Sequence, residues 1–589
     1  MKPSRSPDRQ PPIQEPLLIS RSHMTSESNK TGSWRYLMPR YHDKTAPCSV
    51  ACPAGEDIGR IEMLNTQGFF KEAWETILLE NPFPAVCGRI CFHPCESVCN
   101  RKRFDEAVSI RSLERFVADT AQRYKLEASL QPAARRGEKI AVVGAGPAGL
   151  AAAHFLTLLG YACDVFEALP EPGGILRWGL PRYRLPLEAL APEIERIRQA
   201  GVSFFCGQPV RKDFFRTAAE SYAAIFMTCG LGRMPRLGIP GEESAGVGDG
   251  FAFLRAIVQD DPPVLSGLTA VIGGGNTAVD VARCARRLGA PAVILYRRRR
   301  QDMPAFGEEI EMALSEGVEL MELCVPVNIQ PVEGGLGITL QQMKPSTPDA
   351  DGRTRSVPDG KRVHTITAAH VFKAIGFEAG EPWHLPPPEK ENRLRLRHSV
   401  LTMLPDAIPV VYCGDPVTDI QSVVHAVASA KEGAMALDVL FRKGFRSIPE
   451  ELSSAAAGQD GALSMECHLK GLRSSRSPHV VAYEEINIDY FEYAPRLVQP
   501  RLLQSERLES FAEIDLKISA SMAIREAERC FNCGLCNQCD NCRIFCPDLA
   551  VKLDDSLRGR GIDYDYCKGC GICVVECPRN AMVLEEEKE

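Results

Sequence analysis

The feature that most constrains this chain is a glycine-rich segment, IAVVGAGPAGLAAA, in which an apolar strand pattern leads into a helix pattern. Gly144, Gly146 and Gly149 have the spacing G-x-G-x-x-G, and Glu167 ends the next apolar run. In such a unit the glycines permit a tight turn, close approach of a pyrophosphate and close helix packing, while the acid suits a ribose hydroxyl. Residues 140–163 lack Asp, Glu, Lys and Arg, but glycines at motif positions predict a nucleotide-binding unit rather than a membrane span.

A second segment, LTAVIGGGNTAVDVARCARR, repeats the pattern with Gly273, Gly275 and Ala278 at the three fingerprint positions. Its next strand ends in VILYRRRR rather than in an acid, which puts Arg297 and Arg298 where a ribose 2′-substituent would lie. Arginine carries a forked, permanently charged donor set that matches phosphate. This pattern favours NADPH over NADH. The alternative is a solvated basic loop, since four adjacent arginines cannot all face one phosphate.

The two fingerprints lie about 130 residues apart, within alternating strand and helix patterns. This predicts an α/β fold with two Rossmann-like domains that bring two nucleotides face to face. Asp415 in PVVYCGDP follows a strand and precedes a helix, where it suits a flavin's ribityl or phosphate region or a helix N-cap. No Cys-x-x-Cys pair occurs between residues 130 and 443, so electrons are expected to go to iron-sulfur centres. We assign no catalytic side chain, because the cofactors carry the chemistry.

The C-terminal region repeats one cysteine spacing, C-x2-C-x2-C-x3-C-P, which is typical of ferredoxins with two [4Fe-4S] clusters. In that arrangement the fourth cysteine of each run ligates the other cluster. The first predicted ligand set is Cys536, Cys539, Cys542 and Cys577. The second is Cys567, Cys570, Cys573 and Cys546. Zinc is the alternative occupant of four thiolates, but the duplicated spacing with its trailing prolines favours clusters.

Composition indicates the cellular compartment of the protein and the kinds of partner that it lacks. Of the 23 cysteines, six lie between Cys48 and Cys99, ten lie between Cys530 and Cys577, and the other seven are scattered singly. The N-terminus is polar and Pro-rich without an apolar signal region. We therefore expect a reducing, cytoplasmic compartment rather than a disulfide framework. A net charge of −7 lacks the basic footprint of a nucleic-acid binder. We expect no nucleic-acid partner and no membrane span.

Residues 41–443 resemble the small, or β, subunit of NADPH-dependent glutamate synthase and its relatives, including the flavin end of dihydropyrimidine dehydrogenase. The motifs that carry the resemblance occur in order: GAGPAGLAAA, FEALPEPGGILRWGLPRYRLP, GLGRMPRLGIPGE, GGGNTAVD, YRRRRQDMPA and CGD. The resemblance implies FAD at the first fingerprint, with Glu167 on its ribose and Gly173, Gly174 and Arg177 nearby. It implies NADPH at the second, with Arg297 and Arg298 on the phosphate.

In these relatives one N-terminal cluster motif begins with a C-x2-C pair that precedes a C-x3-C-P pair. Here only Cys48 and Cys52 stand at the N-terminus, and Cys530 and Cys533 resemble the missing half. We expect these four to assemble one cluster, within one subunit or between two subunits of a homodimer. The alternative is that Cys530 and Cys533 are structural thiols or half of a zinc site.

The remaining N-terminal run is CGRICFHPCESVC. By resemblance, Cys91, Cys95 and Cys99 ligate a further cluster, and the fourth ligand is either Cys87 or a side-chain oxygen near Glu114. His93 is a further candidate ligand or a hydrogen-bonding neighbour.

Composition and motifs together divide the chain into six parts. We expect a disordered leader (1–40), a helical iron-sulfur domain (41–130), an FAD-binding domain (131–262 and 370–443), an NADP(H)-binding domain (263–369), a linker and connecting segment (444–525), and a two-cluster ferredoxin-like domain (526–589).

The predicted function is an NAD(P)H:acceptor oxidoreductase that moves electrons between NADPH, FAD, [4Fe-4S] clusters and a partner redox protein, in either direction. The resemblance leaves three kinds of partner open: the dissimilatory sulfite reductase system, 2-oxoacid oxidoreductases and glutamate synthase. Two alternatives remain, namely the NADPH-oxidising small subunit of a glutamate synthase and a non-catalytic electron-wiring subunit.

Overall fold

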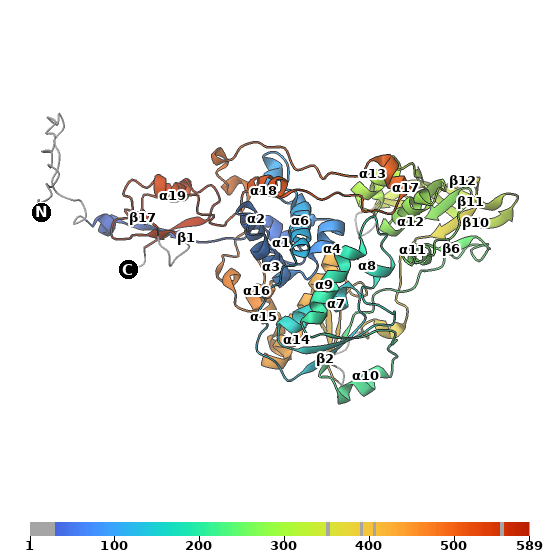
Figure 1. Cartoon of the computed structure of the whole chain (residues 1–589), viewed down its shortest axis with the longest axis horizontal. Helices are drawn as coiled ribbons and strands as arrows, with labels where there is room; N and C mark the ends of the chain where they lie inside the picture. Colours follow the sequence, from blue (N-terminus) through green and yellow to red (C-terminus); the bar gives the residue numbers. More distant parts are fainter. Residues whose placement is uncertain (1–29, 349–353, 389–392, 404–407, 554–558, 588–589) are drawn as a thin grey trace, which may run out of the picture. The chain divides into compact units, whose positions relative to one another are not determined.

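The computed structural model describes residues 30–348, 354–388, 393–403, 408–553 and 559–587. The chain forms two compact units. Unit 1 contains residues 1–41, 538–577 and 582–589, and unit 2 contains residues 42–537 and 578–581. Figure 1 shows the chain coloured along its sequence.

Unit 2 begins with a helical domain whose short helices bring the N-terminal cysteines into one core. Pro47, Pro84 and Pro94 each occupy the first position of a helix, where a missing N–H costs nothing. The helices are α1 (Pro47–Ala51), α2 (Ile58–Thr66), α3 (Phe70–Glu80), α4 (Pro84–Ile90), α5 (Pro94–Ser97), the 3-10 helix η3 (Asn100–Arg103) and α6 (Ile110–Arg123).

The first nucleotide fingerprint builds a seven-stranded sheet in the order β14-β15-β16-β5-β2-β3-β4. The five strands from β16 to β4 pair in parallel, and β14 and β15 add antiparallel partners at the edge. Its strands are β2 (Lys139–Val143), β3 (Ala162–Phe166), β4 (Ser203–Phe205), β5 (Ala224–Met227), β14 (Arg393–Arg395), β15 (Val400–Thr402) and β16 (Val410–Tyr412). Its helices include α7 (Pro147–Leu158), α8 (Ile175–Trp178), α9 (Leu187–Gln199), α10 (Phe214–Thr217) and α14 (Val423–Lys443).

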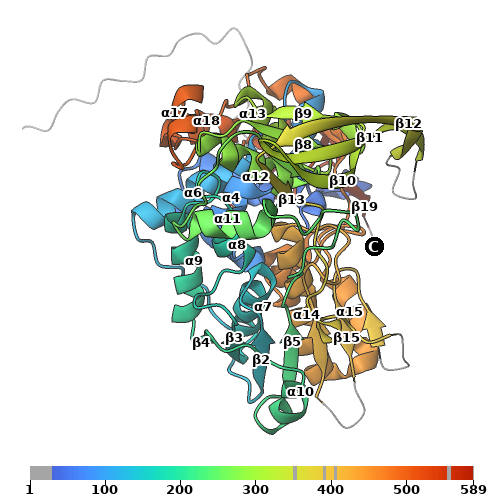
Figure 2. The same cartoon turned by 90° about the vertical axis from the view of Figure 1, so that its right-hand side faces the viewer.

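The second fingerprint builds a five-stranded, all-parallel sheet in the order β6-β13-β7-β8-β9. Its strands are β6 (Val247–Asp249), β7 (Thr269–Ile272), β8 (Ala292–Leu295), β9 (Glu319–Met321) and β13 (His370–Lys373). Its helices are α11 (Gly250–Val258), α12 (Asn276–Arg287) and α13 (Gly307–Ser315). A three-stranded antiparallel sheet adjoins it in sequence, formed by β10 (Cys324–Val332), β11 (Gly335–Pro348) and β12 (Thr354–Ala368). Figure 2 shows the two parallel sheets in separate halves of unit 2.

These sheets confirm the predicted α/β class, but the domain boundary differs from the expected one. Strand β6 at residue 247 and strand β13 at residue 370 both belong to the second sheet, although the expected boundaries placed them in the first domain. Each pairs in parallel within that sheet, β6 with β13 and β13 with β7. A strand's sheet is decided by its hydrogen-bonded neighbours, which the linear pattern does not record.

The segment 444–525 is also not the expected linker. Helices α15 (Ile448–Ser454) and α16 (Met465–His468) pack against α14, and the side chains of Ile448 and Met465 are fully buried. Its small residues permit close contact: a Cβ on Gly461 would lie 1.9 Å from the Ala457 carbonyl oxygen. Farther along, α17 (Gln504–Glu509) and α18 (Ala520–Glu528) follow extended chain, and α18 packs on α2 and α6.

Unit 1 joins the two ends of the chain. Strand β1 (Leu37–Tyr41) pairs antiparallel with β19 (Met582–Glu586), beside α19 (Asn541–Ile544), α20 (Ile572–Val575) and the short strands β17 (Val551–Lys552) and β18 (Gly561–Ile562). Arg35 forms an ion pair with Glu587, and its guanidinium also donates to the carbonyl oxygen of Cys567 at 3.1 Å. Residues 30–40 of the expected leader are therefore structured, and residues 1–29 lie outside the described residues.

Candidate functional site

The first fingerprint forms the turn that its glycines predict. Gly144 has φ +102°, and a Cβ there would lie 2.6 Å from the Thr228 carbonyl oxygen. A Cβ on Gly149 would lie 1.8 Å from the Gly144 carbonyl oxygen, so the glycine lets α7 pack closely on β2. At Gly146 the nearest atom would be 3.9 Å away, which leaves that side of the turn open. The three glycines thus have separate roles, as the motif requires.

Glu167 follows β3 and is buried beside this turn. Its carboxylate accepts hydrogen bonds from the backbone N–H of Ala145 at 2.8 Å and of Leu169 at 2.9 Å. The two bonds fix the carboxylate next to the glycine turn, where it lines a cavity. This position fits a ribose hydroxyl on the far side of the carboxylate.

Three further residues that the resemblance implied lie in the next loop. Gly174 has φ +50° and lines the cavity, and a Cβ there would approach Gly146 to 2.6 Å. Arg177 donates to the carbonyl oxygen of Pro172 at 2.8 Å. Neither Gly173 nor Arg177 is among the residues that line the cavity within the described part of the chain. Arg177 therefore stabilises the loop in this structure rather than facing the cavity.

Asp415 lies where β16 ends, and it lines the same cavity. Burial raises the pKa of its carboxyl to about 6. The N-cap of α14 is Ser422, whose hydroxyl accepts from the backbone N–H of His425. Asp415 is therefore not the N-cap of that helix.

The second fingerprint forms an equivalent turn. Gly273 has φ +147°, and a Cβ there would lie 2.2 Å from the Ala374 carbonyl oxygen. Gly275 faces open space, whereas Ala278 is fully buried in α12. Gly274 is also required, since a Cβ would lie 2.3 Å from the ring of Tyr296. Gly275 thus supplies the open side of this turn, as Gly146 does in the first.

The four arginines after β8 divide into two pairs. Arg297 and Arg298 line the cavity. Arg299 forms an ion pair with Asp302 at 3.1 Å, and Arg300 pairs with Glu311, so these two are held in contacts within the protein. Two of the four arginines therefore line the cavity, where they could contact one phosphate.

One cavity of about 1310 Å³ joins both turns. It is lined by the first turn, the second turn, Arg297 and Arg298, and by residues that the sequence did not single out. Among these are Ile90 and Phe92, which flank Cys91 in the helical domain. The Phe92 ring stacks on Phe306 and His425 at centroid distances of 5.7 and 5.8 Å. An isolated phenylalanine carries no spacing signal, so only the structure identifies it as a wall between a cysteine and the cavity.

The structure gathers the N-terminal cysteines around two sites. Burial raises the pKa of the Cys48 thiol well above its usual range, and the nearby thiols of Cys99, Cys530 and Cys533 raise it further. These four, here called the split tetrad, come from both ends of unit 2 within a single chain.

Cys52 belongs to the second group. Burial raises the pKa of the Cys95 thiol, with further contributions from Cys52, Cys91 and Cys48. Cys87 and Glu114 lie beside Cys91. Burial raises the pKa of the Cys87 and Cys91 thiols, and the nearby Glu114 carboxyl raises both further. The proximity of Cys99 to Cys48 was not expected from the sequence. Cys48 lies within helix α1, whereas Cys52 is its C-cap residue and has an extended backbone, so helical spacing alone does not give the two thiols the same neighbours.

The donor sets fit iron-sulfur clusters. All four members of the split tetrad are thiols, and backbone N–H groups of His93 and Asn532 donate to the sulfurs of Cys91 and Cys530 at 3.3 and 3.4 Å. Among the described residues, no three His, Cys, Asp or Glu side chains converge as ligands of one metal ion. A four-iron cluster holds its thiolates around a larger body, so such convergence is not required.

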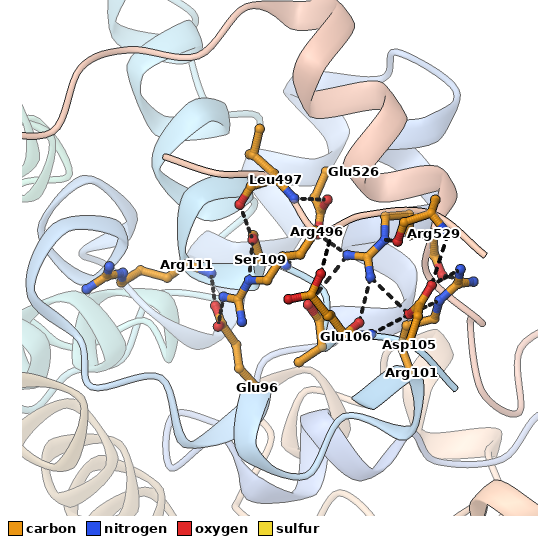
Figure 3. Close-up of polar contacts among 12 residues, drawn as sticks. Glu96, Arg101, Asp105, Glu106, Ser109, Arg111, Arg496, Leu497, Glu526 and Arg529 are labelled. Atoms are coloured by element: carbon orange, nitrogen blue, oxygen red, sulfur yellow. Dashed lines mark hydrogen bonds and ion pairs between the residues drawn. The ribbon is translucent and has the colours of Figure 1, made fainter. Parts of the chain in front are cut away.

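A buried polar network holds the segment that carries Cys530 and Cys533 (Figure 3). Arg529 donates to Glu526 at 2.7 Å and to Asp105 at 3.0 Å, and Arg101 donates to both oxygens of Asp105 at 2.7 and 2.6 Å. Arg101 also donates to the Arg529 carbonyl oxygen at 3.0 Å. Glu526 accepts from the backbone N–H of Ser109 at 2.8 Å. The network ties α18 to the chain that follows Cys99.

In unit 1 the thiols of the second predicted ligand set lie near one another. Burial is the largest cause that raises the pKa of the Cys573 thiol to about 12, and the nearby thiols raise it further, namely Cys567, Cys542, Cys546 and Cys570. From the first set, Cys539 and Cys577 lie beside Cys542, whose sulfur is 3.1 Å from the Tyr41 hydroxyl. Cys536 belongs to unit 2, where its backbone N–H donates to Asp43 at 3.3 Å.

Known protein families match three parts of the chain. Residues 40–126 match "dihydropyrimidine dehydrogenase domain II, 4Fe-4S cluster", residues 138–430 match "pyridine nucleotide-disulphide oxidoreductase", and residues 561–583 match "4Fe-4S binding domain". The NADP(+)-dependent formate dehydrogenase subunit beta of Moorella thermoacetica is 34% identical over 523 residues, which cover 83% of this chain and 70% of that one. The chain belongs to this family of iron-sulfur pyridine nucleotide oxidoreductases.

Two other relatives are similar over part of their length. The NADPH-Fe(3+) oxidoreductase subunit beta of Geobacter sulfurreducens is 37% identical over 57% of this chain and 52% of its own length. The PreT subunit of the NAD-dependent dihydropyrimidine dehydrogenase of Salmonella typhimurium is 31% identical over 67% of this chain and 91% of its own length. This chain therefore spans only about half of the Geobacter relative.

These findings confirm the predicted activity: the protein is an NADPH-dependent oxidoreductase that transfers electrons by way of flavin and [4Fe-4S] clusters. The Moorella and Geobacter relatives are both named as subunits of multi-subunit oxidoreductases. No helix among the described residues is long and apolar enough to cross a membrane.

Proposed function

We propose that the protein passes electrons between NADPH, bound at the second turn, and a partner redox subunit through four [4Fe-4S] clusters in series. The observation that carries this order is the position of Phe92 and Ile90, which line the nucleotide cavity and flank Cys91. A cluster held by Cys91 would therefore lie directly behind the wall of the flavin site. When bound, FAD accepts a hydride and releases its electrons singly, which is the chemistry that the chain must organise.

In this proposal the residues of the cavity bind and orient the two nucleotides. Glu167 holds the flavin ribose, and Asp415 lies at the end of β16 on the flavin side of the cavity. Arg297 and Arg298 hold the 2′-phosphate of NADPH by charge-assisted hydrogen bonds. The aromatic wall around Phe92 excludes water from the path toward Cys91.

The proposed clusters follow the grouping of the cysteines. The first is held by Cys52, Cys91 and Cys95, with Cys87 or Glu114 as the fourth ligand. The second is held by the split tetrad. Cys533 is followed three residues later by Cys536, and three residues of extended chain span at most about 11 Å. The split tetrad therefore leads by a short covalent path to the two clusters of the C-terminal motifs.

We propose a partner of the formate dehydrogenase type as the first to test, since the Moorella relative is named as a subunit of such an enzyme. Sulfite reductase-type, 2-oxoacid oxidoreductase-type and glutamate synthase-type subunits remain the other candidates. In each case the partner would exchange single electrons with the C-terminal clusters. The direction of flow follows from the partner's potential, not from this chain's motifs.

The test is an anaerobic titration of the purified protein, with iron and flavin counted first. We expect one FAD and about 16 iron atoms per chain, the content of four cubane clusters. NADPH should bleach the flavin and the iron-sulfur absorbance together, and NADH should do so poorly. Reduction of the flavin without the clusters would contradict the proposed order of centres.

The partner and the split tetrad have tests of their own. The double variant Cys530→Ser, Cys533→Ser should lose about four iron atoms. Full retention of iron would refute the proposal that the split tetrad holds a cluster. The matched control is Cys467→Ser, a lone thiol that lies outside both cysteine groups. Affinity purification of the tagged chain from its native cells should recover a redox subunit in stoichiometric amount. Reduction of that subunit by NADPH through this chain, or of NADP+ by the reverse route, then fixes the direction.

A further inference from the structure

Asn100 contacts the split tetrad without belonging to it. It follows Cys99, begins the 3-10 helix η3 and is only 9% exposed. Its amide nitrogen Nδ2 lies 3.4 Å from the sulfur of Cys533 and 2.9 Å from the carbonyl oxygen of Val481. Both partners are acceptors, so the NH2 group of the amide, not its oxygen, must face them. Its two N–H groups are therefore both used.

The surroundings of Asn100 leave its amide little freedom. The Val481 backbone N–H donates to Thr45 at 3.1 Å, which fixes the carbonyl that the amide contacts. On the other side, Arg101 is held by Asp105 and by the Arg529 carbonyl oxygen, as Figure 3 shows. The amide thus sits between two anchored segments. One of its N–H groups is directed at the Cys533 sulfur, and the other at the Val481 carbonyl oxygen.

The charges near the split tetrad are distributed unevenly. Glu62 is buried beside Cys48 and Cys530. Arg579 and the Asn100 amide lie on the side of Cys533 instead. A cluster becomes more negative when it is reduced, so an N–H dipole directed at one of its thiolates stabilises the reduced form. The cysteine that receives this bond is also the one three residues from the next motif, at Cys536.

We propose that Asn100 is a positioning residue that raises the reduction potential of the split-tetrad cluster through its hydrogen bond to Cys533. This makes the cluster easier to reduce from the flavin side. It rests on the proposed function, because it requires a cluster at the split tetrad. Asn100 changes the distribution of electrons among the clusters and takes no part in hydride transfer.

The test is a potentiometric titration of the full-length holoprotein, followed by electron paramagnetic resonance, comparing wild type with Asn100→Leu. Leucine has nearly the shape of asparagine and donates no hydrogen bond. We expect unchanged iron and flavin, and one cluster signal shifted to more negative potential. At a fixed ambient potential, the ratio of reduced to oxidised cluster should fall about tenfold, the effect of losing one hydrogen bond to a charged acceptor. An unshifted signal with full iron would overturn the proposal.

Two variants keep the result interpretable if Asn100→Leu loses iron. Asn100→Gln retains the amide and should recover both the cluster and part of the potential. Loss of that cluster from the Leu and Gln variants alike would overturn the tuning role, because the residue would then be needed for assembly. The control is Arg103→Gln, on the same 3-10 helix, whose exposed side chain pairs with Glu484. It should leave the potentials unchanged.

The cysteine double variant distinguishes failure of the Asn100 proposal from failure of the proposed function on which it rests. If Cys530→Ser, Cys533→Ser keeps all the iron, the split tetrad holds no cluster and the proposed order of centres fails. If it loses one cluster together with the signal that Asn100→Leu shifts, the shifted signal belongs to the split tetrad. If it loses a different signal, the cluster assignment stands and the tuning role of Asn100 is refuted.

Discussion

Arg529 offers a direct test of whether the C-terminal segment is held in place by buried charge. Its guanidinium is 5% exposed and makes hydrogen bonds to Glu526, to Asp105 and to the carbonyl oxygens of Glu106 and Ala494. Arg529→Gln keeps a polar side chain but removes the charge. The buried carboxylate of Glu526 and the half-buried carboxylate of Asp105 then lose a cation, although neither loses every partner.

The size of the effect follows from those remaining partners. Breaking a buried ion pair by removing one member costs about 3 to 5 kcal/mol. Asp105 keeps Arg101, and Glu526 keeps the backbone N–H groups of Ser109 and Leu497, each at 2.8 Å. We therefore expect the free-energy cost of Arg529→Gln to lie at the lower end of this range, about 3 kcal/mol. A cost of this size raises the population of the detached segment about a hundredfold.

The assay is hydrogen exchange measured by mass spectrometry on peptides covering residues 494–533, together with the iron content. The variant should exchange about a hundredfold faster in that region, while peptides of the first sheet stay unchanged. Arg103→Gln serves as the control, since its pair with Glu484 joins side chains 59% and 63% exposed and should contribute little. If the two variants exchange alike, the buried network does not hold the segment and the reasoning fails.

Three further predictions concern the nucleotide sites and pH. Gly149→Ala should destabilise the fold by about 1 to 3 kcal/mol by overpacking, measured by urea unfolding, whereas Gly146→Ala should leave stability near wild type and reduce FAD content, because its Cβ faces open space. Arg297→Ala should raise the KM for NADPH about tenfold and leave that for NADH unchanged, and Arg300→Ala, already paired with Glu311, should change neither. Burial lowers the pKa of His154 to about 3. Below about pH 6.5 the unfolded chain therefore binds a proton at His154 that the folded protein does not bind. Stability should thus fall by about 1.4 kcal/mol from pH 7.5 to 5.5, and His154→Gln should flatten that dependence in urea titrations at each pH; an equal slope in both proteins would refute the assignment.

Much of the site could be predicted because its chemistry depends on residues that are close in sequence. A glycine turn is made by five or six consecutive residues, so Gly144, Gly149 and Gly273 show the positive φ or close approach that their motifs require. The division among the four arginines could not be predicted, because Arg300 is occupied by Glu311 from another helix. Phe92 gave no signal at all, since its role depends on which cavity it borders.

The sequence by itself determined the α/β class, the two nucleotide turns and the repeated cluster spacing, all of which are local patterns of strand, turn and ligand. Only the tertiary structure decided that Cys99 joins Cys48, Cys530 and Cys533, that β6 and β13 belong to the second sheet, and that β1 pairs with β19. Spacing records which residues are neighbours along the chain. Partners separated by more than 400 residues, such as Cys99 and Cys533, are selected by buried contacts that no local pattern encodes.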